Sequence, residues 1–364
     1  MPIYMDLHIV PGVIAEHVAE AHQEDLKIQG NYGCRVMTYW VDEAHGSAFC
    51  LLEAPDKESV IEMHNDAHGL IPHEIIEVNS GIVQAFLGRI KYPENHSVSA
   101  DTGLKIFNDP AFRIILVITT IKAKLLEHDL GTTKAREVLY EFTKNVKQQI
   151  AKHEGRLVEM EGEGFVVSFI SASQGINCAF GIQNEVAGLS EEIGLGMSLN
   201  AGLPVDKSDR LFGTTIRFAR HLCTIADSNQ IVLASIVDEL NKSDRQNDQR
   251  LERVKSMTIG EEKFLELMMQ VLEKNWQDAD FTVEDCCRKH SLSKSQLYRK
   301  CVALFKMSPN NLIREYRLVE SLHMLEAGYN VSETTFETGF SSPSYFTKCF
   351  QKRFGLAPLQ YLKM

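Results

Sequence analysis

The spacing of apolar residues divides this chain of 364 residues into three blocks. In the first two blocks, short apolar stretches alternate with longer ones in which apolar residues recur every three or four positions, which predicts alternating strands and helices. The third block has only the helical spacing. Two stretches with few apolar residues separate the blocks, so we expect domains at 1–90, 111–240 and 261–364, with linkers at 91–110 and 241–260. The predicted fold class is multidomain α+β.

The first block is expected to fold as a ferredoxin-like α/β sandwich. Its predicted strands are Ile3–Val10, Arg35–Val41, Ala48–Glu53 and Glu74–Val78. Its predicted helices are Ile14–Gln29 and Lys57–His68. The order strand, helix, strand, strand, helix, strand is the order of that fold. Both helices of such a fold cover the same face of the sheet.

The second block predicts an α/β domain. We expect its strands at Ile114–Ile118, on both sides of Gly164, at Gly196–Gly202 and at Gln230–Ala234, and its helices at Ala135–His153 and Ala179–Val186. In the third block the helical spacing runs from Phe264 onward without a strand signal, which predicts an all-α domain.

Charge is distributed unevenly along the chain. The net charge is −11, yet the stretch from Arg288 to Met364 holds twelve basic and five acidic residues, a balance of +7, so the rest of the chain carries −18. A basic C-terminal module attached to acidic domains is typical of a protein that binds nucleic acid through one part only.

Composition excludes several other classes of protein. No apolar run reaches the length that crosses a bilayer, and the first ten residues lack a basic stretch followed by an apolar one, so we expect a cytoplasmic protein with no membrane partner. The eight cysteines contain no C-x-x-C pair. This argues against a disulfide framework and against a zinc ribbon.

A short helix, a tight turn and a second helix occur twice in the third block. The first pair is Phe281–His290 and the helix after Ser291-Leu292-Ser293, and the second is Val331–Thr338 and Ser341–Phe354. In a helix-turn-helix, the second helix enters the major groove of double-stranded DNA. The side chains expected to contact bases and phosphates are Lys294, Ser295, Gln296, Tyr298, Arg299 and Lys300 in the first pair, and Ser342, Ser344, Tyr345, Thr347, Lys348 and Lys352 in the second.

Residues 264–362 resemble the DNA-binding domain of AraC/XylS transcription regulators. The resemblance rests on the stretches Leu292–Lys300, Ile313–Leu318 and Gly339–Phe350. Thr335 departs from it, because a small alanine is usual at this position of the second motif. The resemblance implies that the two motifs read successive turns of one face of the DNA.

Residues 111–236 resemble class III nucleotidyl cyclases, through Met160–Phe169, Gly196–Gly202 and Phe212–Ala219. Cyclases hold two divalent ions with two carboxylates. By this resemblance the carboxylate positions fall at Thr120 and Glu163, and the positions that stabilise the transition state fall at Arg217 and His221. Because Thr120 cannot replace a carboxylate, we expect a catalytically silent domain kept for dimerisation or ligand sensing, and therefore not an enzyme.

Histidines are concentrated in the first block. Seven of the thirteen lie within the first 73 residues, at positions 8, 17, 22, 45, 64, 68 and 73. His64 and His68 are four positions apart on one predicted helix, so their rings face the same side. Asp6 and His8 share a strand face because their spacing is two. We predict a metal site with the ligands His8, His22, His64 and His68, with Cys50 and Glu53 as weaker candidates. The alternative is that these histidines are surface or hydrogen-bonded residues.

The first block also resembles a small family of bacterial nickel-binding ferredoxin-like proteins. The matching stretches are Met5–Gly12, Tyr39–Asp42, Phe49–Pro55 and His64–Leu70. Leu7 departs from it, since a basic residue is frequent there. The resemblance implies a divalent transition metal as cofactor, with nickel as the first candidate, although imidazole ligands also suit copper and zinc.

These features predict a sequence-specific DNA-binding transcription regulator. A metal ion or a small-molecule effector would act on the first two domains and so control the DNA-binding module. The resemblance to cyclases, which pair head to tail, favours a homodimer. Two alternatives remain: an active nucleotidyl cyclase with relaxed metal ligands, and a metal-binding protein with a vestigial DNA module.

Overall fold

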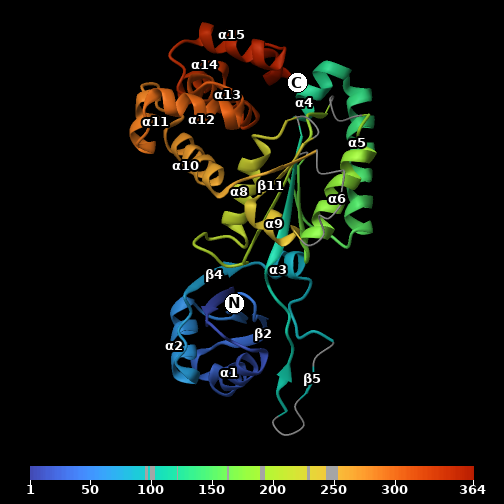
Figure 1. The fold of residues 1–364 in the computed structure, drawn as a ribbon, viewed down its shortest axis with the longest axis vertical. Helices are drawn as coiled ribbons and strands as arrows, with labels where there is room; N and C mark the ends of the chain where they lie inside the picture. The colour runs from blue at the N-terminus through green and yellow to red at the C-terminus, as the bar shows by residue number, and fades with distance from the viewer. Residues whose placement is uncertain are drawn as a thin grey trace.

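The structure, a computed structural model, describes residues 1–94, 97–98, 103–120, 122–161, 164–188, 193–227, 230–242 and 253–364. Its N-terminal region and its C-terminal helices lie at opposite ends, with a larger sheet between them (Figure 1). No described helix is long and apolar enough to cross a membrane. The predicted fold class, multidomain α+β, is confirmed by a four-stranded sheet, a separate six-stranded sheet and a helical C-terminal region.

The N-terminal region is an antiparallel sheet covered on one face by two helices, as predicted. The sheet has the order β2-β3-β1-β4. Its elements are β1 (Ile3–Ile9), α1 (Ala15–Ile28), the short 3-10 helix η1 (Gln29–Tyr32), β2 (Arg35–Asp42), β3 (Ser47–Glu53), α2 (Lys57–His68) and β4 (Glu74–Val78). Asp56 caps α2 by accepting a hydrogen bond from the Ser59 amide, and Gly69 ends the helix in the left-handed conformation. This topology confirms the ferredoxin-like sandwich.

Side chains alternate between the two faces of β1. Tyr4 packs with residues of α1 and α2, while Met5 and Leu7 pack on the other face. Asp6 and His8 share the face of Tyr4, and both are buried there. The alternation therefore places two polar side chains of β1 between the sheet and its helices.

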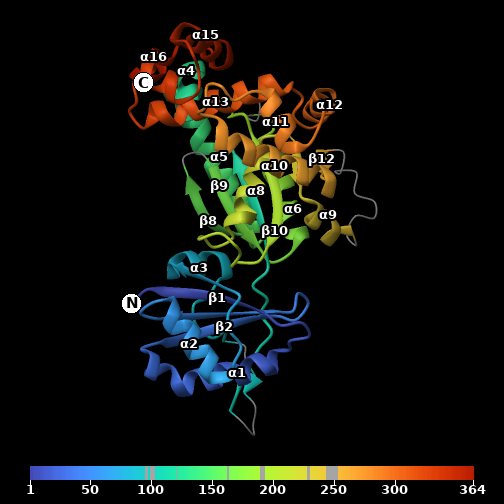
Figure 2. The same ribbon diagram turned by 90° about the vertical axis from the view of Figure 1, so that its left-hand side faces the viewer.

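The opposite face of this sheet packs against the middle of the chain through α3 (Ser80–Leu87). Val83, Phe86 and Leu87 are buried in one apolar cluster with residues of both sheets. The carbonyl of Phe86 accepts hydrogen bonds from Arg113 Nε at 3.3 Å and from Ser168 Oγ at 3.1 Å. The helix α3 thus joins the two sheets (Figure 2).

The stretch expected to be the first linker lies against the N-terminal region in its described part. It contains the two short strands β5 (Ser97–Val98) and β6 (Lys105–Ile106). Phe107 stacks on Tyr39, with ring centroids 4.3 Å apart. Arg89 donates to Asp109 at 2.7 Å, and the Val41 amide donates to the Asp109 carbonyl. This segment is therefore tied to β2.

The middle region is built on a six-stranded sheet with the order β12-β11-β10-β7-β9-β8. The strands are β7 (Arg113–Thr119), β8 (Arg156–Glu161), β9 (Gly164–Phe169), β10 (Gly196–Gly202), β11 (Ile231–Leu233) and β12 (Val254–Ser256), and the helices are α4 (Ala123–Leu130), α5 (Thr132–Lys152), α6 (Ala172–Glu185), α8 (Gly213–Cys223) and α9 (Ser235–Leu240). The α/β prediction is confirmed. The sequence did not predict α4, α8 or α9.

The strand β12 lies inside the stretch expected to be the second linker. It pairs in parallel with β11, with Val254 opposite Ile231 and Ser256 opposite Leu233. A three-residue edge strand carries too few alternating positions to be seen as a pattern, and the partner strand supplies its hydrogen bonds.

The C-terminal region consists of helices in its described part, as predicted. They are α10 (Ile259–Asn275), α11 (Val283–His290), α12 (Lys294–Phe305), α13 (Pro309–Glu326), α14 (Val331–Glu337), α15 (Pro343–Phe354) and α16 (Pro358–Lys363). Capping boxes begin α10 at Thr258 and α12 at Ser293. Ser291, at φ 53°, makes the turn between α11 and α12.

Two helices of the middle region hold the C-terminal helices. His221 on α8 contacts Glu273 on α10, and the apolar core of the middle sheet continues into α10–α12. Leu125 on α4 is buried in one cluster with Leu322 of α13 and with Phe346 and Phe350 of the second helix-turn-helix. Each helix-turn-helix is therefore anchored to a different helix of the middle region.

Candidate metal centre and DNA interface

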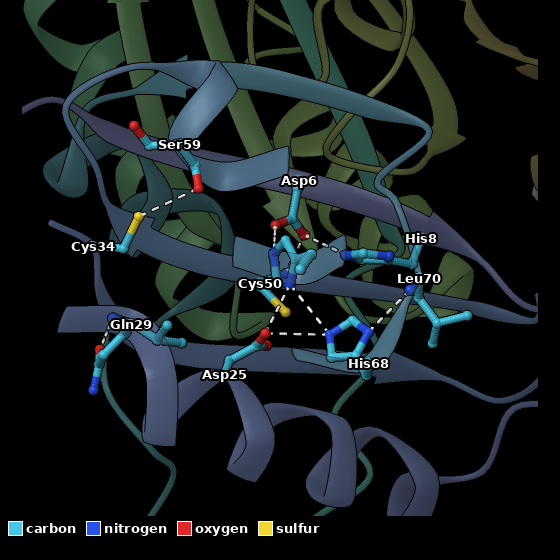
Figure 3. A network of polar contacts seen from close by, with 11 residues as sticks. Asp6, His8, Asp25, Gln29, Cys34, Cys50, Ser59, His68 and Leu70 are labelled. Atoms are coloured by element: carbon cyan, nitrogen blue, oxygen red, sulfur yellow. Dashed lines mark hydrogen bonds and ion pairs between the residues drawn. The ribbon is translucent and has the colours of Figure 1, made fainter. Parts of the chain in front are cut away.

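A group of buried histidines and carboxylates lies between the N-terminal sheet and its two helices (Figure 3). His64 Nε2 lies 2.9 Å from Asp6 and His64 Nδ1 lies 3.0 Å from Asp25. His68 Nε2 lies 3.2 Å from the same Asp25 oxygen, and His8 Nε2 lies 3.4 Å from Asp6. Strand β1 and helices α1 and α2 each supply part of this cluster.

The carboxylates set the protonation of this cluster. Burial disfavours the charged form of His64, but hydrogen bonds with Asp25 and Asp6 outweigh it and raise the pKa of His64 to about 10. Burial would raise the pKa of Asp25, yet hydrogen bonds from His64 and His68 leave it lowered. The pKa of Asp6 is likewise lowered, because the effects of His8 and His64 exceed the effect of burial. Without metal, His64 is a cation held between two anions.

His22 lies apart from the other three histidines. Its Nε2 atom is 2.5 Å from the hydroxyl of Tyr92, and its ring lies 4.8 Å from the ring of Tyr39. Burial lowers the pKa of His22 to about 4, so its ring is neutral at neutral pH. A neutral imidazole is the form that binds a metal ion.

The donor atoms of this region form three overlapping groups, in each of which the atoms lie within 4.8 Å of one another. They are Asp6, His8, Cys50 and His64; His22, Asp25 and Cys50; and Asp25, His64 and His68. No group found among the described residues contains all four predicted histidines. The four histidines were expected to converge on one point, but their donor atoms fall into different groups. Asp25 belongs both to the group of His22 and to the group of His64 and His68.

Three buried polar atoms of these groups have no hydrogen-bond partner among the described residues: His8 Nδ1, His22 Nδ1 and Asp25 Oδ2. A buried polar atom without a partner is costly, so such atoms call for a ligand. Imidazole, carboxylate and thiol are donors that divalent transition metals accept. The residues present therefore fit a metal ion.

Sequence reasoning missed Asp25 and Tyr92. The spacing from His22 to Asp25 is three positions, which puts both on one face of α1, so a search for carboxylates beside each histidine would have found Asp25. Tyr92 lies 70 positions from His22 in a stretch without a pattern, and no local signal indicates their contact.

The first recognition helix, α12, exposes all six side chains predicted to contact DNA. Some of them are engaged within the protein: Lys294 forms an ion pair with Glu284, and Gln296 accepts a hydrogen bond from the Ser293 amide at 2.9 Å. Lys300 lies over the ring of Phe264 at 5.2 Å. Tyr298 and Arg299 are the exposed side chains best placed to meet a ligand.

The second recognition helix, α15, begins after the cap Ser342. Its predicted contact residues Ser344, Tyr345, Lys348 and Lys352 are exposed, whereas Ser342 and Thr347 are half-buried. Phe346 and Phe350 are buried on the opposite side of the helix. The helix therefore presents a polar and basic face to solvent.

A half-buried arginine connects the two motifs. Arg317 on α13 donates to the carbonyls of Trp276 at 2.8 Å and of Asp278 at 2.6 Å, after the end of α10. Gly339 has φ +72° and a Cβ there would lie 2.6 Å from the Trp276 carbonyl, so no larger residue fits. Arg317 is thus a structural residue and not a DNA contact.

The positions that resemble the cyclase site are partly committed to other contacts. Thr120 follows β7, and Glu163 lies outside the described residues. His221 Nε2 lies 2.8 Å from Glu273 Oε1, so this side chain joins α8 to α10. Arg217 lies on the same helix.

Two parts of the chain match models of known families. Residues 4–78 match the family described as nickel responsive protein SCO4226-like, and residues 286–364 match a helix-turn-helix domain. The chain therefore combines an SCO4226-like domain with a helix-turn-helix domain. This confirms the resemblances expected for the first and third blocks.

Parts of the chain are also similar to individual proteins. The uncharacterized HTH-type transcriptional regulator YdeC of Bacillus subtilis is 34% identical over 84 residues, 23% of this chain and 29% of that protein. The crystal structure of SCO4226 from Streptomyces coelicolor is 34% identical, covers 21% of this chain and 94% of that chain, and has a TM-score of 0.20. An adenylate/guanylate cyclase/hydrolase from Silicibacter pomeroyi is 22% identical over 38% of this chain and 83% of that chain, with a TM-score of 0.32. The chain spans between 7% and 56% of the length of the curated relatives it matches.

Proposed function

We propose that this chain is a sequence-specific DNA-binding transcription regulator whose N-terminal domain binds a divalent transition metal. The observation that carries the proposal is the pair of helix-turn-helix motifs, each with an exposed polar and basic second helix, in the stretch that matches a helix-turn-helix family. Tyr298 and Arg299 in α12 and Tyr345 and Lys348 in α15 are the leading DNA contacts. Arginine and lysine neutralise phosphates, and all four side chains can reach base edges.

The metal ligands come from the buried cluster in the N-terminal domain. His8, His64 and His68, with Asp6 and Asp25, form one part of it, and His22 with Asp25 and Cys50 forms the other. Nickel is the first candidate because residues 4–78 match a family described as nickel responsive. A bound ion would supply positive charge to Asp25 and displace the proton from any histidine that coordinates it.

The segment after α3 offers a route from the metal to the rest of the chain. Tyr92 contacts His22 and belongs to the segment that runs through Asp109 into β7. A metal ion that takes His22 changes this contact, and the segment then biases one arrangement of the domains over another. The divisions at 1–90, 111–240 and 261–364 serve as the three domains in this scheme, with 91–110 and 241–260 between them.

The middle domain acts as a catalytically silent cyclase-like scaffold that pairs two copies into a homodimer. A threonine at position 120 removes one of the two carboxylates that a two-ion site needs, and His221 is used to hold α10. Incubation of the purified protein with ATP or GTP and manganese tests this: no cyclic nucleotide is expected, and its appearance would make the protein an enzyme.

The function itself is tested by genome-wide footprinting of the tagged protein at one fixed salt concentration, with and without added nickel. We expect discrete protected sites whose occupancy changes with nickel. Discrete sites whose occupancy does not respond to nickel would support the role as a DNA-binding regulator and refute the role of the N-terminal domain as a nickel sensor. A lack of discrete sites under both conditions would refute the regulator.

A further inference from the structure

A cavity of about 680 Å³ lies where the middle domain meets the C-terminal helices. The end of β7, the start of β9 and α8 form one side, and α10, α12 and α13 form the other. Its volume is in the range of small-molecule sites, which bind ligands between domains by preference. None of the metal or DNA residues proposed above lines it.

The walls of this cavity are apolar on both sides. Phe165 and Val117 come from the sheet, and Met269, Phe305 and Leu312 come from the C-terminal helices. All five side chains are buried. Such walls suit the apolar body of an organic ligand.

The polar groups of the cavity include two carboxylates that lack a cationic partner. Glu320 on α13 makes no hydrogen bond or ion pair in the part of the chain that the structure describes, and Glu273 on α10 contacts only His221 there. Burial raises the pKa of Glu320 and the charge of Glu273 adds to this effect, while the charges of His323 and Lys122 oppose it without cancelling it. His323 also lines the cavity, but it is exposed and forms no ion pair with Glu320.

The basic side chains around the cavity are already paired. Arg353 forms an ion pair with Glu315, and Lys122 lies 3.2 Å from Glu326. Arg220 lies 3.6 Å from Glu159. The charge left without a counter-charge is therefore negative.

His221 provides a separate indication of a ligand. His221 is 6% exposed and lines the cavity, and its Nδ1 atom has no hydrogen-bond partner among the described residues. Since Nε2 lies 2.8 Å from a carboxylate oxygen of Glu273, Nε2 carries the proton and Nδ1 is an acceptor. His221 therefore adds to the residues that line the cavity a buried acceptor without a donor among the described residues.

We propose that this cavity binds a small organic cation, an amine with an apolar body, whose ammonium group donates to Glu320 and Glu273. An ammonium group carries three donors and no acceptor, which complements these groups. The ligand contacts both α8 and the helices α10 and α13. The ligand therefore lies where α8 contacts α10, beside α13, the helix that connects the two helix-turn-helix motifs.

Binding is tested on the full-length protein with three probes of one shape: 4-phenylbutylamine, 4-phenylbutan-1-ol and 4-phenylbutanoate. Dissociation constants are measured by ligand-observed NMR titration. We expect the amine to bind at least about tenfold more tightly than the alcohol and the acid. Equal binding of the three probes, preference for the acid, or no binding of the amine up to about 5 mM would overturn the proposal.

Variants locate the site. Glu320→Gln and Glu273→Gln are each expected to weaken the amine by about tenfold and to leave the alcohol unchanged. Glu137→Gln, on the exposed side of α5, makes the same charge change away from the cavity and is expected to bind the amine as the wild type does. Equal weakening by all three variants would show a non-specific charge effect and refute the site. Thermal melts confirm that the variants are folded. These tests involve neither DNA nor metal, so their outcome is independent of the proposed function.

Discussion

His64 on α2 and Asp25 on α1 meet in the N-terminal core, where His64 Nδ1 lies 3.0 Å from a carboxylate oxygen of Asp25. The other ring nitrogen of His64 contacts Asp6 on β1. One imidazole therefore joins two helices and a strand in the absence of metal. Asp25 in turn belongs to two of the three ligand groups, one with His22 of α1 and one with His64 and His68 of α2.

Removal of His64 or Asp25 is expected to abolish tight nickel binding. His64→Ala and Asp25→Asn each remove one side chain from the centre of the cluster. Loss of a group that holds or orients a metal ion typically lowers the metal affinity by about tenfold to a hundredfold. Isothermal titration with nickel measures the affinity. His17→Ala is the control, since His17 is an exposed histidine of α1 outside the three groups. Unchanged affinity in both cluster variants would place the metal elsewhere.

Loss of an exposed basic side chain from either recognition helix is expected to weaken DNA binding. For Arg299→Ala and Lys348→Ala, a lost phosphate contact lowers the slope of log affinity against log salt by about 1, and a lost base contact costs about 1–3 kcal/mol and relaxes specificity at one position. Fluorescence anisotropy on a footprinted site at several salt concentrations distinguishes the two. Lys147→Ala, on the exposed side of α5, is the matched control. If it weakened binding equally, the recognition helices would not be the contact surface.

Leu125 is expected to be important for holding the second helix-turn-helix. It is buried in one cluster with Phe350 and Leu322, so Leu125→Ala leaves a cavity that costs about 2–4 kcal/mol. The apparent Tm should fall, and protection of the DNA half read by α15 should weaken more than that read by α12. The control is Leu267→Ala, because Leu267 is 38% exposed on α10. A fall in Tm with both halves weakened equally would mean that α4 does not position the second motif separately.

The stability of the folded protein is expected to fall in acid because of His221, which lies between α8 and α10. Burial lowers the pKa of His221, helped by the charge of Arg217 and opposed by Glu273 and Glu266. Folded protein therefore keeps His221 neutral where the unfolded chain, with a pKa of about 6.5, already binds a proton. The stability that depends on this group is complete above pH 6.5 and is lost as the pH falls below about 6.5.

This is measured as the apparent Tm in chelator-treated buffer between about pH 7.5 and 5.5. The wild type should lose more Tm than His221→Gln over this range. His17→Gln, which removes an exposed histidine, should follow the wild type. Parallel curves for the wild type and His221→Gln would contradict the assignment.

The sequence by itself determined the local structure and the chemistry that each block carries. Apolar spacing gave the strand Glu74–Val78 and the helix Lys57–His68 to the residue, because these signals lie within the segment and its caps. The same holds for α12, whose cap Ser293 and turn residue Ser291 are next to each other in the chain. The families that the first and third blocks resemble could therefore be predicted from the sequence alone.

Only the tertiary structure decided how the candidate ligands divide. His64 meets Asp6 across 58 positions, and His22 meets Tyr92 across 70, and no local pattern records either contact. The spacing of His22 and His64 on their helices allowed them to converge, but in the structure the two histidines belong to different groups of donor atoms.

The same reason applies to the domain contacts. The strand β12 exists because β11 offers unpaired backbone groups, and α4 is held by apolar residues of helices about 200 positions later in the chain. A segment that is polar, or too short to show a pattern, forms a strand or a helix when a distant surface supplies its hydrogen bonds or buries its apolar side chains. That surface forms only after each domain has folded, so it leaves no signal in the spacing of residues along the chain.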